Sequence, residues 1–146
     1  MKKTREYLKG IARWLWQSPQ NICGVIWRLV IREKVLYKVE HAFAPYNYNR
    51  IYLTSIKGGV TLGDYIFIES YLVIDIYVLA HEYGHYRQSL ILGPLYLIVV
   101  GVPSLLHNIA HYIGNRIGIR WDYYSFYTES WADKLAGIAR KSIDKT

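Results

Sequence analysis

The stretch VLAHEYGHYRQ, residues 78–88, carries two histidines four positions apart, with a glutamate directly after the first. On an α-helix, residues four apart lie on one face, so His81 and His85 can both reach one metal ion. Glu82 can then reach the water that the metal activates and act as a general base. Gly84 costs helix stability but leaves bare backbone where another element can approach closely. Because such short patterns also arise by chance, the prediction needs a third ligand.

The stretch YTESWADKLAG, residues 127–137, offers that ligand. Glu129 and Asp133 are four apart on a helix predicted over 128–141, so they also share a face. Glu129 would complete a set of two histidines and one glutamate, which in catalytic zinc sites leaves a fourth position for water. Asp133 could accept the second ring N–H of one histidine and fix its orientation. The alternative is a solvated acidic face on a surface helix.

The middle of the chain, over about 35–70, predicts a small antiparallel sheet of three or four strands. Runs rich in Val, Ile, Tyr and Phe partly alternate there as half-buried strands do. Gly58-Gly59 marks a turn between two of these runs, Gly63-Asp64 marks another turn or a bulge, and Pro45 marks a loop. From about residue 72 onward helices dominate, over 75–92, 104–117 and 128–141. The 146 residues fit one α+β domain, in which the sheet packs on the helices that carry the candidate site.

Residues 1–34 form a basic, amphipathic helical arm. They hold eight Lys or Arg and two acids, and so carry +6 of the chain's net charge of +7. Apolar residues recur at helical spacing before Ser18-Pro19, and a second, broadly apolar helix is predicted over 19–31. Basic residues opposite Trp and Leu are typical of a helix that lies in the plane of a membrane. The alternative is a helical hairpin that packs on the protein's own core.

Residues 90–106 contain no charged side chain, and their length is at the lower limit for a helix that spans a bilayer. Gly93-Pro94 and Pro103 would kink or break such a helix. Three interpretations are open: a short kinked span, an interfacial or re-entrant segment, or the buried core helix of a soluble domain. We favour contact with a membrane. The basic start of the chain lacks the unbroken apolar run and cleavage site of a signal peptide, so we expect association with the cytoplasmic face.

Charge and cysteine content argue against two other classes of protein. The excess positive charge lies on the arm rather than on the body, and no nucleic-acid-binding motif is present, so no nucleic-acid partner is expected. Cys23 is the single cysteine. The chain can therefore form neither an internal disulfide nor a metal site with several cysteine ligands.

HEYGH, followed by the ExxxD pattern of the second helix, resembles the gluzincin zinc metallopeptidases, which belong to the zincin-like folds. In that family one helix supplies two His ligands and the base, and a second helix supplies a Glu ligand and a supporting Asp. The resemblance implies Zn²⁺ with three ligands, a base and a support: His81, His85 and Glu129, then Glu82 and Asp133. More narrowly, residues 58–140 look like small bacterial metallopeptidase domains inferred from sequence, which also occur at the C-terminal ends of RHS-type polymorphic toxins.

Hydrolysis of a peptide bond also needs a donor that stabilises the oxyanion. Five side chains are candidates: Tyr123, Tyr124 and Tyr127, just before the second site helix, and His107 and His111, which are four apart. The two histidines could instead form a second metal site, or be the polar face of a helix at a water boundary.

These patterns together predict a zinc-dependent peptidase that hydrolyses peptide bonds with a zinc-activated water at a membrane. Its partners would be a peptide or protein substrate, aligned as an added strand on one edge of the sheet, and a membrane surface contacted through 1–34 and 90–106. Two alternatives stay open. One is a non-enzymatic membrane-binding protein whose metal only stabilises the fold, and the other is a toxin- or bacteriocin-like effector.

Overall fold

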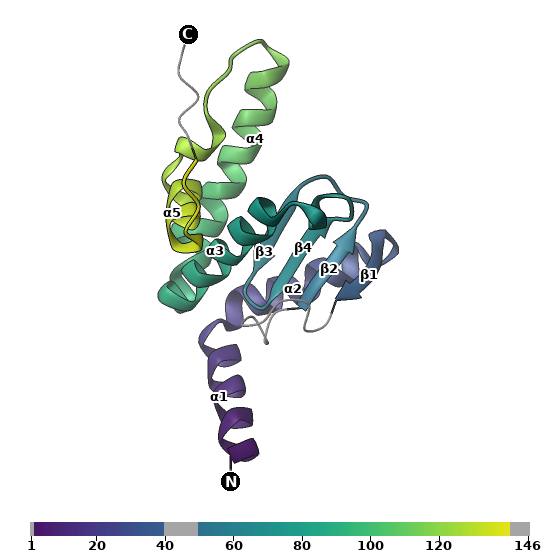
Figure 1. Cartoon of the computed structure of the whole chain (residues 1–146), viewed down its shortest axis with the longest axis vertical. Coiled ribbons are helices and arrows are strands. Elements are labelled where there is room, and N and C mark those ends of the chain that lie inside the picture. Colours follow the sequence, from purple (N-terminus) through teal and green to yellow (C-terminus); the bar gives the residue numbers. More distant parts are fainter. Residues whose placement is uncertain (1, 40–49, 141–146) are drawn as a thin grey trace.

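The computed structural model describes residues 2–39 and 50–140, and the loop predicted around Pro45 lies outside them. The structure is α+β, as the sequence predicts (Figure 1). The described elements are helices α1 (Lys2–Trp16), α2 (Ser18–Val30), α3 (Ile76–Leu92), α4 (Val102–Arg116) and α5 (Tyr127–Ala136), and strands β1 (Val35–Val39), β2 (Arg50–Thr54), β3 (Gly59–Leu62) and β4 (Tyr65–Glu69).

The four strands form one mixed sheet in the order β1-β2-β4-β3. The pairs β1/β2 and β3/β4 are antiparallel, but β2 and β4 run parallel, so the expectation of a wholly antiparallel sheet is corrected for this pair. Burial explains the order. Every residue of β4 is buried, which requires a central position, whereas β3 starts with two exposed residues at the edge.

Two helices cover opposite faces of the sheet. Side chains alternate along each strand, so the strands present apolar residues to both faces. On one face, Tyr52, Tyr65 and Phe67 pack with Ile31, directly after α2. On the other face, an isoleucine cluster packs against Leu79 of α3. Figure 1 shows α2 behind the sheet, α3 in front of it, and α1 and α4 reaching toward opposite ends of the molecule. The helix with the two-histidine motif is thus anchored on the hydrophobic core.

The ends of α3 follow their sequence signals. The side chain of Asp75 caps the start of α3 and accepts a hydrogen bond from the backbone N–H of Tyr77 (2.9 Å). The helix ends at Leu92, directly before Gly93-Pro94, as predicted. A 3₁₀ turn and a π-helix, Leu97–Gly101, then lead into α4.

The helix α5 is shorter than predicted, because it ends at Ala136 and not near residue 141. Gly137 adopts a left-handed backbone (φ +73°), a conformation that terminates helices. The N–H of Ile138 then donates back to the carbonyl of Asp133 (2.9 Å) and completes the cap. Residue 141 itself lies outside the described residues.

Gly84 lets α3 and α5 touch backbone to backbone. A Cβ at this position would lie 2.1 Å from the carbonyl oxygen of Ala132, far closer than atoms can approach. The close approach that the sequence suggests at this glycine is confirmed. It brings the face of α3 with the two histidines against the face of α5 with Glu129 and Asp133.

Candidate metal centre

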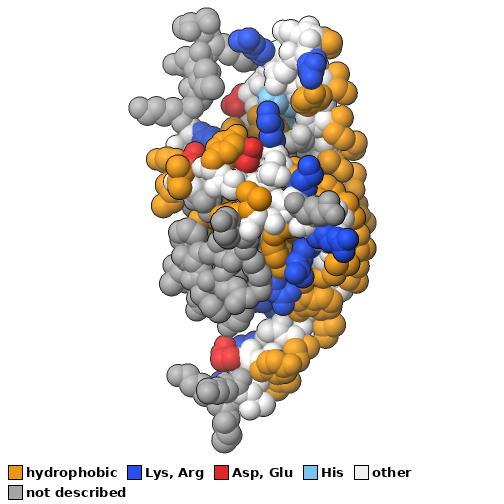
Figure 2. Space-filling view, turned by 90° about the vertical axis from the view of Figure 1, so that its right-hand side faces the viewer, with side chains coloured by type: hydrophobic (Ala, Val, Ile, Leu, Met, Phe, Trp, Pro, Cys, Tyr) orange, Lys and Arg blue, Asp and Glu red, His pale blue; other side chains and the backbone are white. Residues whose placement is uncertain are grey.

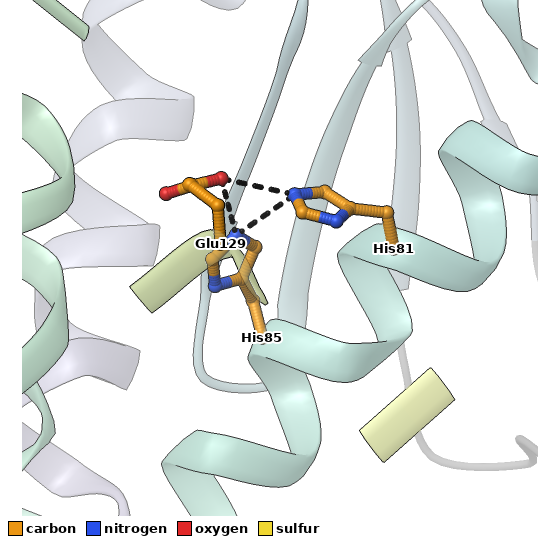
Figure 3. A group of neighbouring side chains, drawn as sticks. All are labelled: His81, His85 and Glu129. Carbon is orange, nitrogen blue, oxygen red and sulfur yellow. Dashed lines mark hydrogen bonds and ion pairs between the residues drawn. The ribbon is translucent and has the colours of Figure 1, made fainter. Parts of the chain in front are cut away.

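Three donor atoms from α3 and α5 converge on one point (Figure 3). His81 Nε2 lies 3.2 Å from His85 Nε2 and 3.1 Å from Glu129 Oε2, and His85 Nε2 lies 3.4 Å from the same oxygen. All three side chains are buried. The group could hold one metal ion, and its members are the three residues that the helix spacing selected as ligands.

Each histidine is oriented through its second ring nitrogen. Asp133 Oδ1 lies 2.7 Å from Nδ1 of His81, as expected for a supporting carboxylate. Gln88 Oε1 lies 2.7 Å from Nδ1 of His85, and the amide nitrogen of Gln88 is engaged with the carbonyl of Thr128 (2.7 Å). Both acceptors call for a proton on Nδ1, which leaves the Nε2 lone pairs for a metal ion. Gln88 was not among the predicted residues, although it lies one turn after His85.

The two carboxylate oxygens of Glu129 have different partners. Oε1 accepts hydrogen bonds from the hydroxyls of Ser104 and of Thr128 (3.0 Å for Thr128), and Oε2 faces the histidines. Burial acts to raise the pKa of Glu129, but hydrogen bonds with His81 and His85 outweigh it and hold that pKa well below its usual range. The site therefore contains a charged carboxylate whose Oε2 faces both histidines and could bind a cation held between them.

His81 is poised to exchange a proton for a metal ion. Burial acts to lower the pKa of His81, but the hydrogen bond with Glu129 and the charge of Glu82 raise it above its ordinary value. A metal ion at this point would replace that proton, since only the neutral imidazole is a ligand.

Glu82 lies beside the three donors and contacts strand β3. Its Oε2 lies 2.6 Å from the hydroxyl of Thr61. A Cβ added to Gly59 would lie only 2.3 Å from its Oε1, so the glycine leaves room for the carboxylate. The carboxylate is thus held between bare backbone and a hydroxyl donor, and it is buried. Sequence reasoning missed Thr61, because only the path of β3 brings it to α3.

The three candidate tyrosines have different surroundings. Burial and the charges of Glu129 and Glu82 raise the pKa of Tyr123, which keeps its hydroxyl protonated. The ring of Tyr124 meets His81 edge-on, with centroids 5.3 Å apart. The hydroxyl of Tyr127 instead donates to the carbonyl of Val99 (2.6 Å).

Tyr127 has a structural task that follows from the sequence of the apolar stretch. Pro103 has no N–H to donate to the carbonyl of Val99, four residues before it. The Tyr127 hydroxyl donates to that carbonyl, which ties the π-helix to the start of α5. Its proton is therefore committed away from the metal centre.

His107 and His111 lie on α4, next to Tyr123. His107 Nε2 is 3.0 Å from the Tyr123 carbonyl, its ring stacks on Phe126, and His111 Nδ1 is 3.2 Å from Asn115 Nδ2. Within residues 2–39 and 50–140, no third ligand forms a metal site with them. The hydrogen bond of His107 and its ring contacts instead support the segment that carries Tyr123.

Arg140 encloses the outer side of the site. Its Nε donates to Asp133 Oδ2 (2.6 Å), and its guanidinium lies 3.4 Å from the centroid of the Tyr124 ring. Asp133 is thereby fixed between a cation and His81, which restrains the imidazole. Sequence reasoning missed this arginine, because it follows the end of α5 and returns only through the turn at Gly137.

Comparisons with models of protein families, with curated protein sequences and with solved structures find no match. The gluzincin resemblance therefore rests on the motif residues alone and stays a prediction. What the structure adds is geometric: α3 and α5 bring the motif residues of both helices into one buried cluster.

Proposed function

We propose that this chain is a zinc-dependent peptidase. The observation that supports it is the convergence of two imidazole nitrogens and one carboxylate oxygen at 3.1–3.4 Å. Ligand atoms bound to tetrahedral zinc at about 2.0–2.1 Å lie about 3.3 Å apart, so the donor set fits Zn²⁺. Three protein ligands with one open position are typical of catalytic zinc, whereas structural zinc is closed by four.

The residues around the donors match the tasks of peptide hydrolysis. A zinc ion held there would supply Lewis acidity, which lowers the pKa of water to about 7 and polarises a carbonyl group. Glu82 would take a proton from the attacking water and deliver it to the leaving amine. Tyr123, which keeps its proton, would donate a hydrogen bond to the oxyanion.

Strand β3 is the element best placed to align a peptide. It is an edge strand of the sheet, it contacts α3, and its residues Gly59 and Val60 are exposed. The carbonyl of Thr61 is already bonded to the buried hydroxyl of Tyr96 (3.2 Å). A substrate strand would therefore pair with the start of β3, directly beside Glu82.

We propose further that the protein works at a membrane. The stretch Leu97–Arg116 is the one helical segment in the described residues that is long and apolar enough to cross a bilayer, judged by length and composition alone. Only 11% of its apolar window is buried. This low burial argues against a buried core helix and supports the two interpretations of the apolar stretch that involve a membrane.

A direct test uses the purified full-length chain in mild detergent. We expect about one zinc ion per chain, and cleavage of fluorescently labelled casein that 1,10-phenanthroline abolishes and added Zn²⁺ restores. Mg²⁺, which prefers oxygen ligands, should not restore it. Cleavage that resists the chelator would contradict the proposal. Bound zinc without any cleavage would favour a metal ion that only stabilises the fold.

Replacing Thr61 by Val should lower kcat by roughly tenfold with little change in KM, because the hydroxyl orients Glu82 and does not bind substrate. Val has nearly the same shape as Thr, so the packing of β3 on α3 is kept. Thr61→Ser, which retains the hydroxyl, should restore most of the rate. If Val and Ser variants have the same kcat, the hydrogen bond to Glu82 has no role in the reaction.

A further inference from the structure

The helix α2 turns its polar side toward the protein and its apolar side outward. Gln20 and Asn21 are 0% exposed, whereas Ile26, Leu29 and Val30 are 55%, 62% and 71% exposed. In a protein surrounded by water the opposite orientation is expected, because burial of apolar surface drives helix packing. The outward face of α2 therefore calls for an apolar neighbour, which the described residues do not supply.

Hydrogen bonds hold α2 in this reversed orientation. The amide of Gln20 donates to the hydroxyl of Ser89 on α3 (2.8 Å), and that hydroxyl donates to Oε1 of Gln17 (2.6 Å). On the side of the sheet, the backbone N–H of Asp64 donates to Oδ1 of Asn21 (2.8 Å). Buried polar groups are costly unless they are paired, so these bonds fix the inward face of α2.

The helices α1 and α4 also expose large apolar side chains. Six exposed side chains of α1, α2 and α4 make up what we call the apolar edge: Leu8, Leu15, Ile26, Leu29, Leu106 and Ile109. Figure 2 shows hydrophobic side chains along one edge of the molecule over most of its length, on the side where α2 lies in Figure 1. A continuous exposed apolar surface of this kind marks an interaction site.

The charges and aromatic residues near the apolar edge identify its partner as an anionic lipid surface. Figure 2 shows Lys and Arg side chains beside the hydrophobic ones. The stretch 97–121 contains two arginines and no Asp or Glu. Trp16, Trp27 and Trp121 are 50%, 37% and 37% exposed, and tryptophan favours the boundary between lipid and water.

The length of the apolar edge decides how it meets the bilayer. The helices α1 and α4 lie toward opposite ends of the molecule and have 15 residues each. At 1.5 Å per residue each is about 22 Å long, so together with α2 they exceed the hydrocarbon thickness of about 30 Å. The edge therefore fits within the plane of one leaflet and not across a bilayer.

The polar face of α4 supports the same orientation. Ser104, His107 and His111 recur on one face of this helix, where the first two are bonded to Glu129 and to the Tyr123 carbonyl. Leu106 and Ile109 are exposed on the helix. Since a helix is about 10–12 Å wide, α4 can separate the metal centre from lipid by one helix diameter.

We propose that α1, α2 and the stretch 97–116 lie in the plane of one leaflet of an anionic bilayer, with the metal centre about one helix diameter above the acyl chains. The proposal deepens the membrane association proposed above and names its geometry. In this geometry the substrates would be peptide segments at a membrane surface. Only this statement about substrates rests on the proposed peptidase activity.

The test measures the depth of single labels in the full-length protein, so α2 and its buried contacts stay intact. Cys23→Ser removes the native thiol, and single cysteines at Leu8, Ile26, Val102 and Ile109 carry an environment-sensitive fluorophore. Lys57→Cys and Lys134→Cys, at exposed polar positions, serve as matched controls. Vesicles contain phosphatidylcholine with or without about 30% phosphatidylglycerol, and lipids with nitroxides at known depths act as quenchers. Circular dichroism checks that each variant is folded.

We expect all four labels on the helices to lie at one shallow depth, about 5–10 Å into the boundary, and both controls to stay in water. Phosphatidylglycerol should increase binding by at least about tenfold. A depth that grows steadily from Val102 to Ile109 would instead indicate a spanning helix and overturn the proposal. Absence of vesicle binding, with concentration-dependent dimers, would assign the edge to a second copy. Each result is independent of casein cleavage, so the geometry and the activity can fail separately.

Discussion

Glu82→Gln is expected to abolish peptide hydrolysis while the metal stays bound. Gln has the shape of Glu but cannot accept the proton of the attacking water, so kcat should fall by about 10²–10⁴-fold. The metal should remain, because the three donor atoms belong to His81, His85 and Glu129. The amide can still bond with the hydroxyl of Thr61, which keeps the contact between α3 and β3. The measurements are kcat for casein or a peptide derived from it and the zinc content of the same sample.

Glu69→Gln is the matched control for this substitution. Glu69 is also buried, but its carboxylate accepts the backbone N–H of Gly58 (3.1 Å) and takes no part in the metal centre. We expect this variant to cleave at close to the parent rate. A Glu82→Gln variant as active as the parent would show that the base lies elsewhere. Loss of zinc in that variant would instead show that Glu82 supports the ion.

The parts of the site that were predicted from sequence are those set by helix periodicity. The spacing of four between His81 and His85, and again between Glu129 and Asp133, places each pair on one face whatever the rest of the chain does. Gly84 added a second signal, because a bare backbone within a motif indicates close packing. Local geometry therefore identified the donors and one of their supports.

The supports that were missed depend on long-range contacts. Thr61 reaches Glu82 only because β3 is the edge strand beside α3, and Ser104 reaches Glu129 only because the chain turns back after Gly93. Neither relation has a spacing rule. The parallel pairing of β2 with β4 was missed for a similar reason, since alternation predicts strands but not their order. The continuous apolar run of β4 was the signal available for its central place.

The orientation of α2, with its polar side toward the protein, also depends on long-range contacts. Its sequence predicts a broadly apolar helix in a basic arm, which could pack on the protein or lie on a membrane, and the sequence pattern alone does not separate the two cases. The contacts of Gln17 and Gln20 with Ser89 place the polar face inward, which supports the proposed contact of the outward face with lipid. Orientation relative to the body, and not amphipathicity, is what distinguishes a core helix from a lipid-facing one.

Glu129→Ala is expected to lower zinc affinity by more than about 100-fold. Loss of an outer hydrogen-bond partner of a ligand costs about 10–100-fold, and loss of a ligand must cost more. The measurement is competition for zinc with a chromogenic chelator. The hydroxyls of Ser104 and Thr128 lose their shared acceptor in this variant. Thermal melting of the metal-free samples therefore checks whether the variant is still folded. Casein cleavage should disappear with the zinc.

Asp133→Asn provides the graded comparison for the third ligand. It keeps the shape of the side chain, but the neutral amide accepts more weakly from Nδ1 of His81 and loses its ion pair with Arg140. We expect zinc affinity to fall by about 10–100-fold, less than for Glu129→Ala. Lys134→Ala, an exposed change one residue further along α5, should leave affinity unchanged. If Glu129→Ala binds zinc as tightly as Lys134→Ala, Glu129 is not a ligand, and the ion must take its third donor from another residue.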